Sequence, residues 1–305
     1  PILEYDEDAL ENLVPIANTA RDMGGEDLRD FLVKQLNMWM QWSNALYIKD
    51  IKEWKRCAAL RTLKDFRGSK CYVGVDLSSG GDLTSIAIVI PYMVDGVKKY
   101  FVHTHSFIPA SRVDEHIKTD KVPYDVWISK GLVTVTETLG GIKTDYKYII
   151  KYLEDLIKQN DLKPQLVCYD PHNASAFLSD LEALGFDSVA ITQTAKELND
   201  ATVDFRLEIK AGNVVIEGTE VGKGKVVPFD ELLTWSIANA KTISNSYGEI
   251  KIDKALDEDR IDPIDAIIDA WKAAMKEEYK PDTNEVVNEW LEMYEKYMGK
   301  GGEKE

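Results

Sequence analysis

The chain has 305 residues, of which 44% are hydrophobic and 30% are charged, and this length allows a substantial buried core. Its formal net charge of −16 excludes a protein that binds nucleic acid chiefly through its overall field, so any such binding must be confined to a local groove. The sequence contains no apolar run of the roughly 18 residues that span a membrane and no basic-then-apolar leader, which predicts neither a membrane segment nor a signal peptide. The cysteines Cys57, Cys71 and Cys168 are far apart and odd in number, which predicts free buried thiols in a reducing compartment.

The first part of the chain, residues 1–66, is predicted to be a helical segment, because leucines and aromatic residues recur at helical spacing from about Asp6 to Phe66. Its tryptophans Trp39, Trp42 and Trp54 favour packing against a neighbouring domain over a ligand site. We expect the main domain at residues 67–280, and a C-terminal helix with a flexible tail at residues 281–305.

The main domain begins with three consecutive strands. The apolar runs at 71–76, 84–90 and 100–107 predict them, and Asp95-Gly96 predicts a two-residue turn between the second and third. Short strands and helices then alternate. We expect strands at 132–136, 165–170, 189–192 and 213–217, and helices at 111–118, 145–159, 171–184, 205–211, 232–240, 262–276 and 286–298. This order predicts an α/β fold in which helices pack on a mixed central sheet.

Three aspartates stand where such a sheet would bring them together. Asp76 ends the first strand and is followed by a Ser- and Gly-rich stretch, Asp170 ends a later strand, and Asp262 opens the last long helix. Read alone, Asp76 fits a solvated turn as well as a metal ligand, and Asp262 before Pro263 fits a helix cap. Asp269 shares the helical stripe of Asp262, and we expect it on a solvated acidic face.

The chemistry of clustered carboxylates favours a metal site. Such groups repel one another unless a cation neutralises them, and Mg²⁺ or Mn²⁺ prefers these oxygen ligands. Two ions about 4 Å apart can activate water and stabilise the leaving oxygen in phosphodiester cleavage. A zinc site at His103 and His105 lacks further ligands at suitable spacing, whereas His172 is close enough to the acids to bind a phosphate or position a water.

The chain resembles the C-terminal nuclease domain of the large terminase subunit of tailed bacteriophages and prophages, in the HK97-like branch. The residues that carry the resemblance lie at 74–79 with 82–84, at 169–171, at 235–240, and at Lys254 with 260–263 and Ala266. The resemblance implies a ribonuclease-H-like fold and a two-metal endonuclease with Mg²⁺ or Mn²⁺, in which Asp76, Asp170 and Asp262 are the catalytic metal ligands. Asp265 is a possible further ligand, although an apolar residue is expected there, and His172 and Lys254 are possible auxiliary groups.

The same resemblance implies the partners. They are concatemeric viral double-stranded DNA, the portal protein, the small terminase subunit and an N-terminal ATPase domain whose motifs are absent here, so we expect this chain to be a fragment acting in the cytoplasm of the infected bacterial host, with no membrane partner. Basic residues that would guide the DNA backbone are Lys143, Lys147, Lys151, Lys196, Arg206 and Lys210.

Other functions remain open from the residues alone. An actin- or sugar-kinase-like phosphotransferase also has a first strand ending in Asp, but it needs a second Asp-Gly-rich phosphate turn, which this sequence lacks. A resolvase- or transposase-like nuclease would share the acids and differ in substrate. A non-catalytic module of the packaging machine would use the acids as caps and turns.

Overall fold

A computed structural model gives the structure of the chain. The residues that it describes are 9–23, 31–36, 45–78, 83–137, 144–172, 174–254 and 260–278. Trp39, Trp42, Lys143 and the expected helix at 286–298 lie outside these ranges. Within them, no helix combines the length and the apolar character that crossing a bilayer requires.

The predicted three consecutive strands are confirmed. They are β2 (Lys70–Asp76), β3 (Thr84–Val94) and β4 (Val97–Pro109), and they pair antiparallel in sequence order. The turn between β3 and β4 is the predicted Asp95-Gly96, with φ of 50° and 76°, the left-handed backbone that a two-residue hairpin turn requires.

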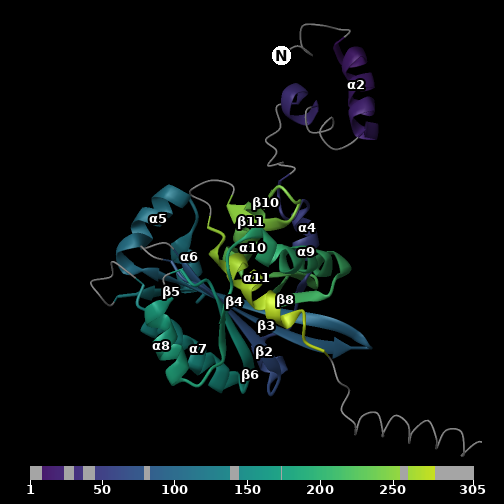
Figure 1. The fold of residues 1–305 in the computed structure, drawn as a ribbon. Helices are drawn as coiled ribbons and strands as arrows, with labels where there is room; N and C mark the ends of the chain where they lie inside the picture. The colour runs from purple at the N-terminus through teal and green to yellow at the C-terminus, as the bar shows by residue number, and fades with distance from the viewer. Residues whose placement is uncertain are drawn as a thin grey trace, which may run out of the picture.

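The central sheet has nine strands among the described residues, in the order β1-β8-β4-β3-β2-β6-β7, with β5 beside β4 and β9 beside β8 (Figure 1). β6 runs parallel to β2, and the mixed sheet of the prediction is therefore confirmed. The other strands are β1 (Ala58–Ala59), β5 (Val133–Thr136), β6 (Lys163–Tyr169), β7 (Ser188–Ala190), β8 (Val214–Val221) and β9 (Lys225–Pro228), and a separate antiparallel hairpin contains β10 (Ala240–Ser244) and β11 (Ile250–Lys254).

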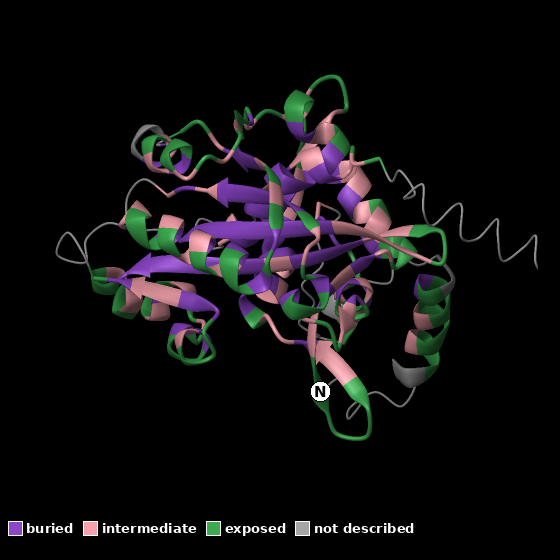
Figure 2. Ribbon diagram, turned by 90° about the horizontal axis from the view of Figure 1, so that it is seen from below, coloured by how far each residue is buried: buried purple, intermediate pink, exposed green. Residues whose placement is uncertain are grey.

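Helices cover both faces of this sheet (Figure 1). One face buries Tyr72 of β2 against α9 (Ala195–Ala211), α10 (Glu231–Asn239) and α11 (Asp262–Ala274). The other face buries Val73 and Val75 against α7 (Tyr146–Asn160) and α8 (Ser175–Ala183). The alternation of side chains along β2 thus divides the core into two layers, and Figure 2 shows the strands between them buried.

A smaller third cluster lies at one edge of the sheet. Here α5 (Val113–Asp120) and α6 (Tyr124–Ser129) pack with β5, and Tyr124 and Trp127 are buried between them. This cluster contacts the rest of the domain near the start of α11, where Arg260 bonds Asp120 of α5.

The N-terminal part is only partly helical. Its helices are α2 (Ala9–Met23), a π-helix (Phe31–Gln35), α4 (Ile51–Lys55) and a 3₁₀ helix (Leu63–Phe66). The expectation of helix throughout is wrong at β1, which pairs parallel with β8. Trp54 is fully buried, packs on Phe205 and donates from Nε1 to Thr234 Oγ1 at 3.2 Å, so its predicted packing role is confirmed. The division of the chain at residues 66 and 280 stays a prediction.

α11 lies unusually close to β2. A Cβ atom at Gly74 would stand 1.8 Å from the backbone oxygen of Ala266 and 2.8 Å from the backbone nitrogen of Ala270. Glycine is therefore required at this position, and the residues of α11 on either side of Ala266 are held over the end of β2.

Candidate active site

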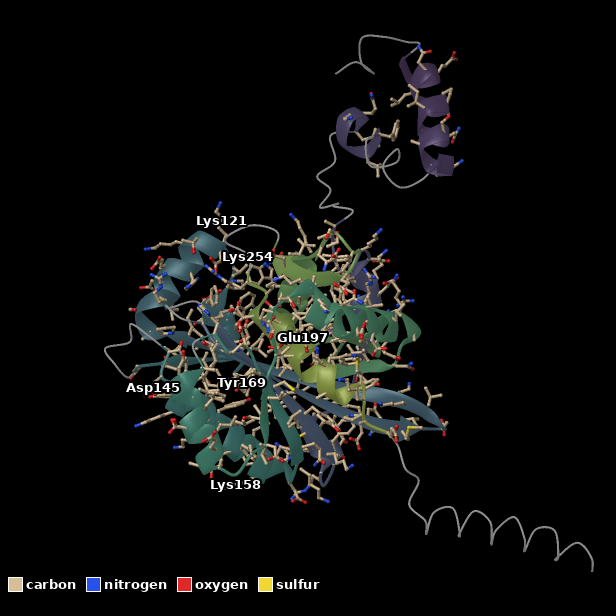
Figure 3. The ribbon with its side chains drawn as sticks, in the orientation of Figure 1. Lys121, Asp145, Lys158, Tyr169, Glu197 and Lys254 are labelled. Atoms are coloured by element: carbon tan, nitrogen blue, oxygen red, sulfur yellow. The ribbon has the colours of Figure 1, made fainter. Side chains whose placement is uncertain are left out.

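Asp76 and Asp170 end two adjacent parallel strands. The last paired residues of β2 and β6 are Val75 and Tyr169, Asp76 follows the first and Asp170 follows the second. Tyr169 lies in the middle of the main body in Figure 3, whereas Lys158 lies at its edge. The sheet therefore places both carboxylates at its carboxyl end, as the sequence predicts.

Three aspartates of α11 face this point. Asp262, Asp265 and Asp269 are three and four residues apart, so they form one stripe along the helix. The pKa of Asp76 is raised well above its ordinary value, first by burial and then by the negative charges of Asp262, Asp265, Asp269 and Asp170. Five carboxylates thus share one electrostatic site.

Asp269 is not on a solvated face, and that prediction is wrong. Its residue is 1% exposed, and Gln193 Nε2 donates to its two carboxylate oxygens at 3.0 and 3.2 Å. Burial, and secondarily the charge of Asp170, raises the pKa of Asp269 to about 8. The prediction failed because α11 is buried on almost every side, so the stripe opposite its apolar residues is interior as well.

Asp265 lies between the other two acids of the stripe. Burial, followed by the charges of Asp269 and Asp262, raises its pKa, and the positive charge of Lys251 on β11 opposes this shift. Lys251 Nζ also donates to the backbone oxygen of Gln193 at 3.2 Å. A lysine and a glutamine therefore support the inner part of the acidic site.

Asp262 is the first helical residue of α11, and Ile261 occupies the cap position without a side-chain cap bond. The cap role considered for Asp262 is therefore not what the structure shows. Asp262 is partly buried, and its charge acts on both Asp76 and the buried Tyr124. It thus faces the acidic site rather than bulk solvent.

A buried ionic network fixes the chain just before Asp262. Arg260 donates to both oxygens of Asp120, from Nε at 3.1 Å and from Nη2 at 3.2 Å. Tyr124 Oη donates to Asp120 Oδ2 at 2.8 Å, and His116 Nδ1 lies 3.0 Å from the same Oδ2 atom. Burial alone would raise the pKa of Asp120, but these hydrogen bonds, led by that of Arg260, lower it. The network ties the start of α11 to α5 and α6.

The other predicted site residues lie farther apart. His172 is exposed, and its backbone N–H donates to Asp170 Oδ1 at 2.9 Å, so it follows the site directly. Lys254 is exposed at the end of β11. His105 is a core histidine that stacks on Tyr152 and bonds Thr134 Oγ1 at 2.8 Å. His103 is partly buried, and its buried Nε2 has no partner among the described residues.

The predicted basic residues do not form one row. Lys147 and Lys151 are exposed on the first half of α7, across the sheet from α9. Lys196 and Lys210 stand near opposite ends of α9, about 21 Å apart along the helix axis. Arg206, between them, lies over the ring of Tyr47 at 5.9 Å. Any DNA path must therefore use other cations too.

The donor set fits hard divalent cations. It consists of carboxylate oxygens in a partly buried site, where mutual repulsion is relieved by positive charge. Among the described residues, no three His, Cys, Asp or Glu side chains already stand at coordination distance from one point. Binding would therefore require these aspartates to draw together through side-chain rotation.

The acidic site should make the metal-free protein less stable as the pH rises. The pKa of Asp269 in the folded protein, about 8, is above its unfolded value of about 3.9, so the folded state binds more protons between these values and stability falls with rising pH. We expect the Asp269 contribution to fall by up to about 1.4 kcal/mol per pH unit between pH 5 and pH 7. Urea unfolding in the presence of a chelator measures it.

The control for this expectation is Asp269→Asn, in which the slope of unfolding free energy against pH should be flatter. Identical slopes in the parent and the variant would show that the folded protein does not hold a proton at this carboxylate.

Asp269, Gln193 and Lys251 are the members of the site that the sequence did not indicate. Asp269 lay in the correct helical stripe, and its spacing from Asp265 was the available signal. Gln193 and Lys251 lie in a loop and a hairpin that become neighbours only through tertiary packing, so no local pattern identifies them.

Comparison with known proteins identifies the family of the chain. A family model described as "Terminase large subunit, endonuclease domain" matches residues 1–278. The large terminase subunit of Enterobacteria phage HK97 is 29% identical over 195 residues, which are 63% of this chain and 35% of that protein. The large terminase subunit of Lactococcus phage p2 is 22% identical over 216 residues, 71% of this chain and 37% of that protein.

A solved structure extends this likeness to the fold. The crystal structure of the HK97 bacteriophage large terminase matches with a TM-score of 0.61 and 26% identity, over 75% of this chain and 43% of that one. The matched region spans little more than a third of the two curated relatives. The mixed sheet and its flanking helices form a ribonuclease-H-like fold. The chain therefore belongs to the family of terminase large subunit endonuclease domains.

Proposed function

We propose that this chain is a metal-dependent endonuclease that cuts concatemeric viral double-stranded DNA during genome packaging. The observation that carries the proposal is the meeting of Asp76 and Asp170, at the ends of adjacent strands, with the aspartate stripe of α11. Membership of the endonuclease domain family supports nuclease chemistry at this site.

In this proposal Asp76, Asp170 and Asp262 hold two Mg²⁺ or Mn²⁺ ions, with Asp265 as a further ligand. When bound, such ions activate the attacking water and stabilise the leaving oxygen. The charges of four other carboxylates act on Asp76, so a bound cation would relieve repulsion there. The protein contributes the rigid placement of these groups on two strands and one helix.

Neighbouring side chains support this placement. Gln193 orients Asp269 beneath the ligands, and the Arg260–Asp120 pair holds the chain before Asp262. Tyr146 Oη donates to the backbone oxygen of Ser78 at 3.3 Å, which ties the start of α7 to the chain that leaves β2. His172 and Lys254 are both exposed, and the proposal gives them auxiliary roles toward a phosphate.

The whole assembly is also part of the proposal. The chain would act beside an ATPase domain, a portal protein and a small terminase subunit in the cytoplasm of the infected bacterial host. The basic residues Lys147, Lys196 and Lys210 would contact the DNA backbone at separate points.

A plasmid cleavage assay tests the proposal. We expect the purified chain to convert supercoiled plasmid to nicked and linear forms with Mn²⁺ or Mg²⁺, and a chelator to stop the reaction. Asp170→Asn should lose this activity, while Asp155→Asn, at an exposed position on α7, should retain it.

The assay also separates the alternatives. Absence of cleavage with every divalent metal tried would reject the nuclease and favour a non-catalytic module. Cleavage of four-way junctions without cleavage of plasmid would instead indicate a resolvase-like substrate.

A further inference from the structure

A groove of about 720 Å³ lies away from the aspartates, between α4, β9 and α10. Its floor contains apolar side chains, among them Pro228 and the partly exposed Trp235. Its rim carries four exposed cations, Lys52, Lys55, Arg56 and Lys225. The feature is notable because the chain as a whole has a net charge of −16.

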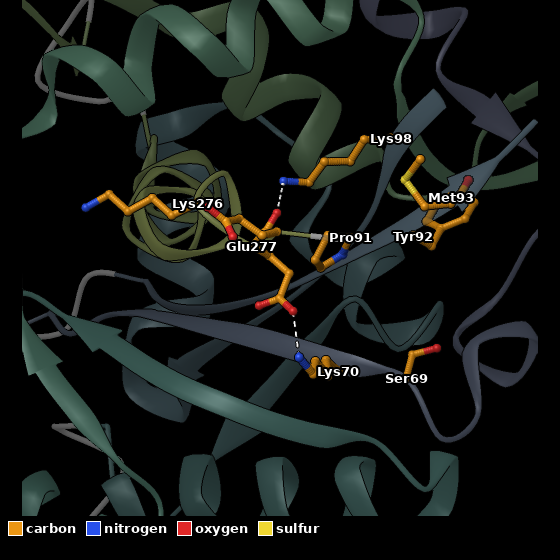
Figure 4. Close-up of a pocket in the computed structure, with 9 residues that line it drawn as sticks. Ser69, Lys70, Pro91, Tyr92, Met93, Lys98, Lys276 and Glu277 are labelled. Carbon is orange, nitrogen blue, oxygen red and sulfur yellow. Dashed lines mark hydrogen bonds and ion pairs between the residues drawn. The ribbon is translucent and has the colours of Figure 1, made fainter. Parts of the chain in front are cut away.

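The charged residues of this groove differ from those of a second groove in whether they are paired. In the part of the chain that the structure describes, none of the four cations forms an ion pair, and the acid that lines the groove, Glu231, is paired with Lys130 at 2.8 Å. The second groove, of about 680 Å³, shows the contrast (Figure 4). There Lys70 bonds the carboxylate of Glu277 at 2.6 Å and Lys98 bonds its backbone oxygen at 2.6 Å. Among the described residues, the cations of the first groove therefore keep an uncompensated positive charge, whereas Lys70 and Lys98 of the second groove are already bonded to Glu277.

The cations stand on a rigid frame. Trp54 anchors α4 through its bond to Thr234 of α10, and Asp50 caps α4 by accepting from the backbone N–H of Lys52 at 2.9 Å. On the other side of the groove, Lys225 pairs with Val221 in the β8–β9 hairpin. Two separate segments thus place these four residues along one groove.

The groove lies toward the same end of the sheet as the aspartates. Ser106 of β4 is level with Asp76 across β3. β8 runs parallel to β4 and pairs with it as far as Ile216. Beyond that point β5 takes the place beside β4, and β8 continues to Val221, which pairs with Lys225. β9 pairs with β8, and β8 is three strand positions from β2, about 14 Å at the usual ~4.8 Å spacing of strands. This distance corresponds to about four nucleotide steps of roughly 3.4 Å along a DNA strand.

We propose that this groove binds the phosphodiester backbone of the DNA duplex whose scissile phosphate lies at the aspartates. The inference rests on the proposed nuclease function and adds where the substrate is held. An acidic chain repels DNA at long range, so it needs a local set of unpaired cations at a rigid site, and the groove supplies one. Contacts of this kind fix the position of the duplex without reading its sequence.

Binding of a fluorescent DNA duplex, measured over a range of salt concentrations with a chelator present, tests the inference. In one variant Lys52, Lys55, Arg56 and Lys225 are changed together to Gln. The matched control changes the exposed Lys64, Lys118, Lys121 and Lys163, away from the groove, to Gln. Both variants alter the net charge equally, so any difference between them reports the location of the cations.

We expect the groove variant to bind at least about 10-fold more weakly and the slope of log affinity against log salt to fall by about 3 to 4, since each phosphate contact contributes about 0.9. The control should lose less than about 2-fold. An equal loss of DNA affinity in both variants overturns the inference about the groove. If the parent still cleaves plasmid in that case, the proposed nuclease function stands. Unchanged DNA binding together with lost binding of polyglutamate also overturns it, and assigns the groove to an acidic protein partner. A parent that neither binds nor cuts DNA rejects both proposals.

Discussion

Replacing Asp76 with Asn is expected to abolish DNA cleavage and, without metal, to make the protein more stable. Asp76 is desolvated and four carboxylates repel it, so its charge destabilises the metal-free fold. Asn keeps the shape and removes the charge, which should raise the free energy of unfolding at neutral pH by about 1 to 3 kcal/mol. Cleavage should fall by at least about 1,000-fold, because the remaining acids cannot hold the cations in place. Urea unfolding and plasmid nicking measure the two effects.

Metal titration provides the control for this pair of effects. Mn²⁺ should raise the melting temperature of the parent, since a ligand that binds only the folded state stabilises it, and should raise that of Asp76→Asn much less. Asp155→Asn should behave like the parent in all three measurements. An Asp76→Asn protein that cuts plasmid at the parental rate would remove Asp76 from the site.

Replacing Gly74 with Ala is expected to destabilise the fold by about 3 kcal/mol or more, or to prevent folding. The added Cβ meets backbone atoms of Ala266 and Ala270, which cannot rotate away as a flexible side chain can. α11 would have to move off β2, and the aspartate stripe would move with it. Urea unfolding of the purified variant gives the stability, and cleavage per folded molecule gives the effect on the site.

Gly185→Ala is the matched control for Gly74→Ala. Gly185 has φ of 76° and no atom within 4 Å of its added Cβ, so the substitution there costs only the left-handed conformation, about 1 kcal/mol. An equal cost at both positions would show that α11 can shift without loss, and the rigid placement of its acids would not hold.

The strand that carries Asp76 and the strand that ends before Asp170 were predictable because each is a short apolar run closed by an acid. Local pattern also identified the Asp95-Gly96 turn. The first half of α9 was missed because its apolar residues are sparse, although Thr194 and Glu197 carry the spacing of a capping box. The hairpin of β10 and β11 was missed as well.

The environment of the acids could not be predicted in the same way. Whether the stripe with Asp269 faces water depends on what packs above α11, and residues far apart in the sequence supply that cover. Gly74 lies inside a recognisable motif, but its need for glycine follows from the approach of a helix almost 200 residues later. Neither property is encoded within a local window of sequence.

The buried cysteines have a consequence for how the folded protein meets oxidants. Burial raises the pKa of Cys57, Cys71 and Cys168 to about 12 each, and the thiolate is the form that reacts. Cys71 lies in the core layer beneath α7 and Cys168 in the layer beneath α11. The fold itself therefore protects these thiols from oxidation. They would react only after one of the two core layers opens.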